Sequence, residues 1–357
     1  MVPDEAALLF YLTNFTGGEI NMLNIGIIGA GRIGKVHGES ITYHVKNARV
    51  AAMADPYWTD DSRKWAKEMG IPTYDDYHHI LKDPAIDAVM ICSSTQTHAP
   101  ISIEAIRAGK HVFCEKPISR ELSEIKSVMK ELEHSHLKYQ VGFNRRFDHN
   151  FHAVREIVES GKIGDVHIVK ITSRDPDSPP IEYVKVSGGI FLDMTIHDFD
   201  MVRYLTGSDV EEIYANSAVL VDPGIGEAGD VDTAIITMKL ANGALAVIDN
   251  SRKAVYGYDQ RAEVFGSKGQ AAVSNDLPSS AVVSTSDGIT GEKPLYFFLE
   301  RYMESFATEV TQFTESVLND TPVAVTVNDG LQAVLIAKAA AKSVKEHRPV
   351  KLSEIQF

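Results

Sequence analysis

The chain has 357 residues, of which 44% are hydrophobic and 24% charged, so its composition is that of an ordinary globular protein of two or three domains. An excess of 49 acidic over 35 basic side chains gives a formal net charge of −14, which would repel a nucleic acid duplex or an anionic membrane surface. No continuous apolar run approaches the roughly 18 residues that a bilayer-spanning helix needs. We therefore expect a cytoplasmic protein with no nucleic acid or membrane partner.

The first segment, residues 1–21, contains no Lys or Arg, so it matches neither a secretory signal nor a transit peptide. A strand-like run begins directly after Met22. We therefore interpret residues 1–21 as an N-terminal extension without a role in catalysis. A genuine N-terminal arm is the alternative.

Residues 22–143 alternate short apolar strands with amphipathic helices. This alternation is typical of a parallel sheet covered on both faces, and such a sheet binds ligands beyond the carboxyl ends of its strands. The sequence predicts strands at 23–29, 50–55, 87–94, 111–117 and 138–143, and helices near 32–46, 59–69, 98–109 and 121–134.

A second domain is expected to span residues 144–357. Its longer segments alternate polar and apolar residues with a period of two, which predicts a mostly antiparallel sheet with one buried face. "ANG" at 241–243 and "GSKG" at 266–269 are typical of hairpin turns. Helices predicted near 296–318 and 328–346 end the chain, and we expect them to pack back on the first domain.

The stretch "GAGRIG" lies between a predicted strand and a predicted helix. In a dinucleotide site of this kind, Gly29 makes the tight turn, Gly31 admits the pyrophosphate and Gly34 lets the helix pack closely on the strand. The free N–H groups at the start of the helix then bind the anion. Asp55, which ends the next strand, is placed to bind a ribose and to repel a 2′-phosphate, so we predict NAD rather than NADP as the cofactor.

A lysine in "CEKP" ends the strand that begins near His111. Because the residue before a proline is pushed toward an extended conformation, Lys116 is expected at the carboxyl end of that strand, where a parallel sheet places its ligands. A lysine that merely covers a strand end is the alternative. Other cofactor contacts are expected along this edge at Arg32, Ile33, Ser93, Thr95, His98 and Glu115. Capping of a helix by Thr97 explains the segment around His98 equally well.

The stretch "GGIFLDMTIHDFDM" carries polar residues at helical spacing. Asp193, His197 and Asp200 stand at i, i+4 and i+7 and would share one face of a continuous helix. This face has three interpretations: a solvated surface, a metal site or acid–base machinery. The residue types suit zinc, manganese or iron. However, no H-x-x-x-H or C-x-x-C pattern accompanies them, so we expect no metal.

The glycine motif, "EKP" and the D-x-x-x-H helix together resemble the Gfo/Idh/MocA oxidoreductases, from about Met22 to the C-terminus. The longer stretches "GFNRRFD", "GEAGDVDTA" and "VIDNSRKAVYGYDQRAEVFGSKG" are similar to the bacterial inositol 2-dehydrogenases within that family. The resemblance implies an N-terminal Rossmann domain at 22–143. It also implies that residues 144–357 form a substrate-binding and oligomerisation domain, of the α/β type with an open, mostly antiparallel sheet, in a homotetramer.

Lys116, Asp193 and His197 match the catalytic residues of that family. A histidine is suited to remove a hydroxyl proton near neutral pH, and a lysine to stabilise the negative charge that develops on the reacting oxygen. The aspartate is expected to bind a neighbouring hydroxyl. Asp200 is expected to hold a ring hydroxyl or to orient His197. Further substrate contacts, matched to the resembling stretches, are expected at Asn144, Arg145, Asp175 and Tyr256.

The resemblance implies oxidation of myo-inositol at C2 to the ketone, with NAD as the hydride acceptor. Another cyclitol or sugar (scyllo-inositol, D-chiro-inositol or glucose) is the nearest alternative, because Asn144 stands where some related enzymes have methionine. A redox-silent NAD-binding regulator predicts loss of one of the three catalytic residues, and all three are present. NAD-assisted hydrolysis or epimerisation, which yields no net NADH, is a further alternative.

Overall fold

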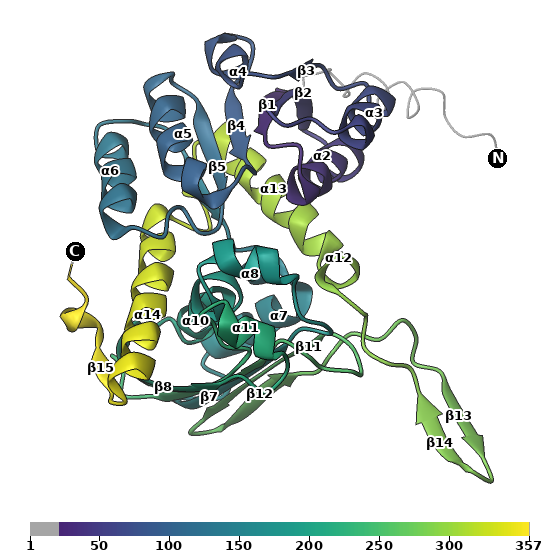
Figure 1. Ribbon diagram of the computed structural model, residues 1–357, viewed down its shortest axis with the longest axis vertical. Coiled ribbons are helices and arrows are strands. Elements are labelled where there is room, and N and C mark those ends of the chain that lie inside the picture. Colours follow the sequence, from purple (N-terminus) through teal and green to yellow (C-terminus); the bar gives the residue numbers. More distant parts are fainter. Residues whose placement is uncertain (1–20, 357) are drawn as a thin grey trace, which may run out of the picture.

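Residues 21–356 are described by a computed structural model, in which helices pack against two large sheets (Figure 1). The extension predicted at residues 1–21 lies outside this range, apart from its last residue. Within residues 21–356, no helix has the length and apolarity needed to cross a membrane.

The first sheet is parallel, as the sequence predicts, with the strand order β3-β2-β1-β4-β5-β6. Helices cover both of its faces, so β4 at its centre is buried along its whole length. The strands are β1 (Leu23–Ile28), β2 (Ala48–Ala54), β3 (Thr73–Tyr74), β4 (Ala88–Ile91), β5 (His111–Glu115) and β6 (Tyr139–Gly142).

Amphipathic helices connect these strands, and four of them lie within a few residues of their predicted positions. α3 begins with a capping box, in which the hydroxyl of Thr59 accepts the N–H of Ser62. β3 and α4 are too short to show a periodic pattern, and the sequence did not predict them. The helices are α2 (Arg32–His44), α3 (Asp60–Glu68), α4 (His78–Lys82), α5 (Thr95–Arg107) and α6 (Leu122–Leu132).

The second sheet has the strand order β12-β11-β7-β10-β9-β8-β15. In the described part of the chain, every neighbouring pair of its strands is antiparallel except β7 and β10. Both predicted hairpin turns are confirmed, because they join β9 to β10 and β11 to β12. The strands are β7 (Val166–Arg174), β8 (Val210–Ala218), β9 (Thr233–Leu240), β10 (Leu245–Ser251), β11 (Asp259–Gly266), β12 (Gly269–Val273) and β15 (Val350–Lys351).

One face of the second sheet is covered by helices, and the other is open (Figure 1). Along β9, buried and exposed side chains alternate strictly, as a sheet with one buried face requires. The covering segments include η1 (Asn144–Phe147), α7 (His149–Glu159), α8 (Ile181–Ser187), α9 (Ile190–Asp193), α10 (Thr195–Thr206) and α11 (Pro223–Glu227).

The last helices connect the two sheets. Val310 and Phe313 of α13 share a hydrophobic core with β1 and β4, and α13 packs against α2. Leu331 and Val334 of α14 share a core with β5 and β6, while the same helix also packs on β8 and α10. The elements are α12 (Phe298–Arg301), α13 (Met303–Leu318), α14 (Val327–Glu346) and η2 (Leu352–Glu354).

A two-stranded arm projects from the second domain (Figure 1). Its strands, β13 (Val282–Thr285) and β14 (Gly288–Gly291), pair with each other and are exposed along their whole length. The sequence did not predict this arm. It leads directly into the aromatic segment before α12.

Candidate active site

The glycine loop has the geometry that a dinucleotide requires. Gly29 has a φ of +108°, and a Cβ on Gly34 would lie 2.0 Å from the carbonyl oxygen of Gly29. A Cβ on Gly31 would meet no atom within 4 Å, so this side of the loop is open. No side chain among the described residues caps α2, whose first N–H groups therefore remain available to an anion. Asp55 accepts the N–H of Ala30 at 2.7 Å and so ties the loop to the end of β2.

A cavity of about 680 Å³ lies beside this loop, between the carboxyl edge of the first sheet and the second domain. The predicted residues Arg32, Ile33 and Glu115 line its side toward the first domain. An aromatic wall that runs from the segment before α12 through α12 and into α13 closes another side, and comprises Tyr296, Phe297, Phe298, Tyr302 and Phe306.

Lys116, Asp193 and His197 meet in this cavity. The Nζ of Lys116 donates to the backbone oxygen of Asp193 at 2.9 Å. The Asp193 carboxylate accepts hydrogen bonds from the Tyr183 hydroxyl at 2.8 Å and from Nη1 of Arg252 at 3.0 Å. The fold thus brings Lys116 to Asp193, which is 77 positions further along the chain, and to His197, which is four positions beyond Asp193.

The expected continuous helix is interrupted at Met194. Asp193 ends α9, and α10 begins at Thr195, so Asp193 and His197 are on two helices rather than on one face of a single helix. Gly188 and Gly189, with φ values of +92° and +86°, end α8 and turn the chain into α9. The break lets the carbonyl oxygen of Asp193 face Lys116 while its carboxylate faces Arg252.

His197 is held as a neutral imidazole. Burial, followed by the positive charges of Lys116 and Arg145, lowers its pKa well below the ordinary value of 6.5. Its ring packs edge-on against Phe143, and its Nδ1 has no hydrogen-bond partner among the described residues. A neutral imidazole at the wall of a cavity is suited to accept a proton from a bound hydroxyl.

Asn144, Arg145 and Asp175, which were expected to contact the substrate, also line the cavity. Arg145 is held by Asp198, a residue that the sequence analysis did not single out, at 2.6 Å. Burial raises the pKa of Asp175 to about 6, although the charges of Arg252 and Arg145 lower it. The cavity wall therefore combines anionic acceptors with cationic and amide donors.

The structure corrects the expectation for Asp200. Its carboxylate is 1% exposed, does not line the cavity and accepts two hydrogen bonds from Arg146, at 2.6 and 2.8 Å. The segment η1, which carries Arg146, covers this side of α10. Asp200 therefore joins two elements of the second domain and faces Arg146 rather than the cavity.

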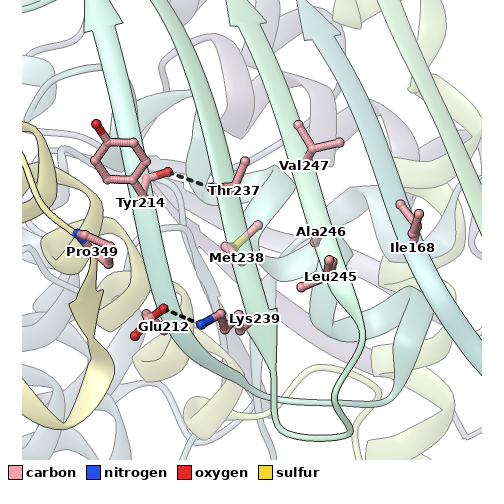
Figure 2. Close-up of a pocket in the computed structure, with 10 residues that line it drawn as sticks. All are labelled: Ile168, Glu212, Tyr214, Thr237, Met238, Lys239, Leu245, Ala246, Val247 and Pro349. Carbon is pink, nitrogen blue, oxygen red and sulfur yellow. Dashed lines mark hydrogen bonds and ion pairs between the residues drawn. The ribbon is translucent and has the colours of Figure 1, made fainter.

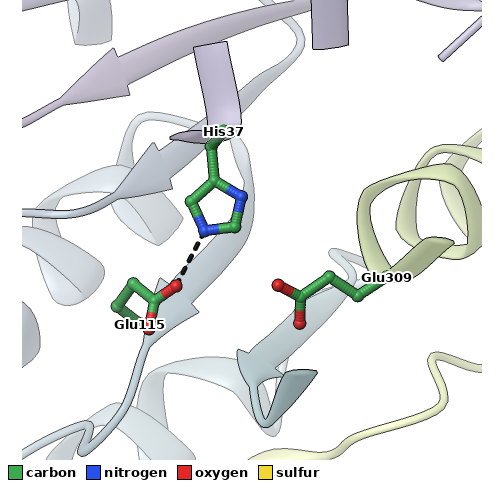
Figure 3. Close-up of side chains that lie close together, drawn as sticks. All are labelled: His37, Glu115 and Glu309. Carbon is green, nitrogen blue, oxygen red and sulfur yellow. Dashed lines mark hydrogen bonds and ion pairs between the residues drawn. The ribbon is translucent and has the colours of Figure 1, made fainter. Parts of the chain in front are cut away.

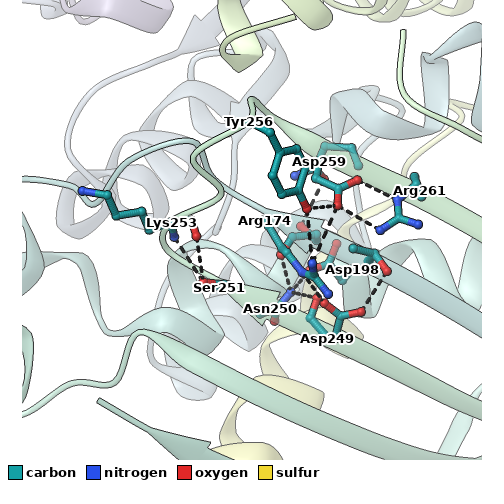
Figure 4. A network of polar contacts seen from close by, with 12 residues as sticks. Arg174, Asp198, Asp249, Asn250, Ser251, Lys253, Tyr256, Asp259 and Arg261 are labelled. Carbon is teal, nitrogen blue, oxygen red and sulfur yellow. Dashed lines mark hydrogen bonds and ion pairs between the residues drawn. The ribbon is translucent and has the colours of Figure 1, made fainter. Parts of the chain in front are cut away.

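Tyr256 is likewise placed outside the cavity, in a polar network at the end of the second sheet (Figure 4). Its hydroxyl donates to Asp259 at 2.6 Å and accepts from Arg174 at 3.2 Å. Tyr258, two residues further along, lines the cavity instead.

His98 has a structural position rather than a place at the cavity. It is 2% exposed, and its ring nitrogens lie 2.8 and 2.9 Å from the carbonyl oxygens of Pro117 and Ser93. Ser93 and Thr95 also lie outside the cavity wall, at the start of α5, so their contact with the cofactor stays a prediction.

Arg252 is the main residue of this site that sequence reasoning missed. Its side chain is 3% exposed and lines the cavity, between Asp193 at 3.0 Å and Asp175 at 3.7 Å. Its Nε and Nη2 have no hydrogen-bond partner among residues 21–356. One signal was available: Arg252 directly follows β10, at the same sheet end as Asp175 after β7.

Comparison with known proteins identifies the family of this chain and several of its relatives. Residues 23–143 match the model of an oxidoreductase family with an NAD-binding Rossmann fold, and residues 151–272 match the GFO/IDH/MocA C-terminal domain. The chain is 48% identical to a myo-inositol 2-dehydrogenase of Thermotoga maritima, over 93% of this chain and 99% of that protein. It is 44% identical to an inositol 2-dehydrogenase of Rhizobium meliloti, again over 93% and 99%.

A solved structure has the same arrangement of both domains. The scyllo-inositol dehydrogenase of Lactobacillus casei, crystallised with NAD(H) and scyllo-inositol, has a TM-score of 0.86 and 31% sequence identity to this chain. The match covers 93% of this chain and 99% of that one. The glycine loop, the parallel sheet and these matches together show that the chain belongs to the Gfo/Idh/MocA family of oxidoreductases and binds NAD through its Rossmann domain.

Proposed function

We propose that the protein oxidises the C2 hydroxyl of myo-inositol to a ketone while NAD is reduced to NADH. The observation that carries this proposal is the convergence of Lys116, Asp193 and His197 in one cavity at the NAD edge of the first sheet. The relatives named for myo-inositol or inositol oxidation at 44–48% identity support the choice of substrate.

His197 is the proposed general base. The hydroxyl proton passes to its neutral imidazole, because the lowered pKa keeps the ring unprotonated. The ammonium group of Lys116 then stabilises the negative charge on the reacting oxygen. NAD, bound along the Gly29–Gly34 loop, supplies the hydride acceptor. Asp193 positions Lys116 through its backbone oxygen and offers its carboxylate to a neighbouring hydroxyl.

The polar wall suits a cyclitol, which presents a hydroxyl group around its whole ring. Asp175 supplies an acceptor and Asn144 and Arg145 supply donors. Nε and Nη2 of Arg252, which find no acceptor among the described residues, can donate to a ligand. Buried polar groups that a ligand leaves unpaired are costly, so this wall disfavours substrates without matching hydroxyls.

Another cyclitol is the second candidate, and the similarity to a scyllo-inositol dehydrogenase favours scyllo-inositol in particular. D-chiro-inositol presents the same kind of secondary alcohol at a different ring geometry, and glucose presents a hemiacetal hydroxyl at C1. A redox-silent regulator is disfavoured, because the acid–base residues are not only present but assembled.

A screen of NAD reduction distinguishes these substrates. The full chain is assayed by NADH absorbance with myo-, scyllo- and D-chiro-inositol and with glucose, under identical conditions. We expect the highest kcat/KM with myo-inositol. A higher kcat/KM with scyllo-inositol would move the assignment to the second candidate, and formation of no NADH with any polyol would refute the proposed activity.

We also propose that the open face of the second sheet mediates assembly into a homotetramer. This face carries a shallow hollow of about 540 Å³, with Leu245 and Ile168 on it (Figure 2). Leu245 and Ile168 are neighbours across β10 and β7, and Phe265 is the next neighbour of Ile168 across β11, so the three share one face. They are 50%, 36% and 43% exposed, which is costly for apolar groups in a monomer.

A further inference from the structure

Three ionisable side chains meet behind the cavity wall: His37 from α2, Glu115 from the end of β5 and Glu309 from α13 (Figure 3). One nitrogen or carboxylate oxygen of each lies within 4.8 Å of the other two. Glu115 lines the cavity next to Lys116, whereas His37 and Glu309 have no part in the mechanism above. This cluster therefore connects buried groups to the cofactor side of the site.

The first pair in the cluster is hydrogen-bonded and closely packed. His37 is fully buried, and its Nε2 lies 2.7 Å from Oε1 of Glu115. Phe113 and Phe306 pack edge-on against the imidazole, at centroid distances of 5.2 and 5.6 Å. A Cβ on Gly142 would lie 3.1 Å from the Glu115 carboxyl, so the glycine leaves room for that group against β6. His37 thus holds one side of the Glu115 carboxylate.

Glu309 is the unexplained member. Its side chain is 0% exposed, its carboxyl group faces the other two residues, and neither oxygen has a hydrogen-bond partner within the described residues. Two carboxylates this close cannot both stay ionised in a buried site without compensation. Burial, followed by the negative charge of Glu115, raises the pKa of Glu309 well above its ordinary value. Either a proton or a cation must therefore accompany the pair.

The distances favour a proton over a metal ion. Two ligands that are each about 2.1 Å from a tetrahedral ion lie about 3.4 Å apart. Nε2 of His37 and Oε1 of Glu115 are only 2.7 Å apart, which is a hydrogen-bond length. With these two atoms bonded to each other, the nitrogen of His37 that remains is Nδ1, which points away from the Glu115 carboxylate, so an ion could not be held between His37 and Glu115.

We propose that Glu309 is a positioning residue of the cofactor site: a neutral carboxyl group that lies within 4.8 Å of the His37–Glu115 pair and, on a side-chain rotation that brings its O–H into hydrogen-bonding distance, donates to that pair and fixes the Glu115 carboxylate at the cavity wall. The charged neighbour of the cluster is Lys116, whose backbone N–H donates to Oε2 of Glu115 at 3.3 Å and whose ammonium group is held by Asp193. Gln140 of β6 donates to the backbone oxygen of Glu309, and Arg145 of η1 is bonded to Asp198. Two thiols lie near the cluster: that of Cys114, which donates to the backbone oxygen of Glu115 at 3.3 Å, and that of Cys92, whose pKa is raised by burial.

The first test measures NAD affinity by calorimetry on the full chain without substrate, so its outcome is independent of which polyol is oxidised. Glu309→Gln keeps a neutral donor of the same shape, and we expect its Kd for NAD to stay within about threefold of the wild type. Glu309→Leu removes the donor beside a buried acceptor, and we expect an affinity about tenfold weaker. Glu315→Gln, on the exposed side of the same helix, is the matched control and should change nothing.

The second test detects the proton on the Glu309 carboxyl group by infrared spectroscopy. It does not require the Glu309→Leu variant to fold. Infrared difference spectra should show a protonated carboxyl group at neutral pH that is missing in Glu309→Gln. At alkaline pH, loss of this proton adds a negative charge beside Glu115. The Kd of the wild type for NAD should therefore rise as the pH increases, whereas the Kd of Glu309→Gln should not show this rise. Equal weakening in the Gln and Leu variants, absence of the infrared band, or a stoichiometric metal ion lost on Glu309→Gln would overturn the proposal.

Discussion

At the scale of single residues, the proposed reaction depends on a histidine that stays neutral and a lysine that stays close to the reacting oxygen. His197 meets the first condition because burial and two neighbouring cations oppose its protonation. Lys116 meets the second because the carbonyl oxygen of Asp193 holds its ammonium group at 2.9 Å. Both effects come from residues that are distant in sequence.

The pH dependence of kcat/KM should separate His197 from Asp175. Because the pKa of His197 is lowered, its neutral form persists well below pH 6.5, whereas Asp175, with a pKa of about 6, loses its charge as the pH falls through that value. We expect the kcat/KM of the wild type to fall as the pH drops below about 6, and we expect this fall to be absent in Asp175→Asn. His197→Gln should lower kcat by roughly 10²- to 10⁴-fold across the whole range. The same fall in Asp175→Asn would assign it to a different group.

Site residues that stand in a sequence motif could be predicted, but the residues that bind them in the fold could not. Lys116 and Asp193 stand in patterns that indicate a site, and the structure places both in the cavity. Arg252 has no such pattern around it, since an arginine after a strand is usually solvated. Only the register of β10 beside β7 brings it between Asp175 and Asp193.

At the scale of elements, the break between α9 and α10 decides which polar residues face the cavity. A helical spacing argument treats Asp193, His197 and Asp200 alike, yet it contains no information about what covers each side of the helix. Nη2 of Arg146 lies 2.6 Å from a carboxylate oxygen of Asp200 and 3.0 Å from one of Asp329, in a network that joins η1, α10 and α14. Asp200 is therefore expected to contribute to stability rather than to substrate binding.

Asp200→Asn tests this assignment. It leaves the buried Arg146 without its main counter-charge, so we expect the free energy of unfolding to fall by about 3 kcal/mol. The KM for the polyol should stay within about twofold at a temperature where the variant is folded. Asp75→Asn, which breaks a pair with Arg63 in which both side chains are exposed, is the control and should cost less than about 1 kcal/mol. A raised KM with unchanged stability would instead restore Asp200 as a substrate ligand.

At the scale of the whole molecule, the sequence predicted both sheets, both hairpin turns and the NAD loop. These features depend on local periodicity and on glycine geometry, which are visible in a single sequence. The projecting arm of β13 and β14 was missed because its pairing buries no side chain and so leaves no alternating apolar pattern. The shape of the cavity was also beyond prediction, since it depends on how the aromatic segment before α12 folds back between the two sheets.

The open sheet face makes a prediction about assembly. Leu245→Glu places a charge among the exposed apolar residues of this face, so we expect the proposed tetramer to dissociate into smaller species in light scattering coupled to size exclusion. Tyr43→Glu replaces an exposed aromatic residue of α2 with the same charge and is the matched control. An unchanged molar mass for Leu245→Glu would place any self-association on another surface.

Isotope transfer from labelled substrate tests the central claim most directly. The full chain is incubated with NAD and myo-inositol that carries deuterium at C2, and both products are analysed by mass spectrometry. We predict that the deuterium appears in NADH, that the ketone has lost it, and that His197→Gln forms both products far more slowly. Unlabelled NADH, or a ketone that retains the deuterium, would contradict oxidation at C2 in the Lys116–Asp193–His197 cavity.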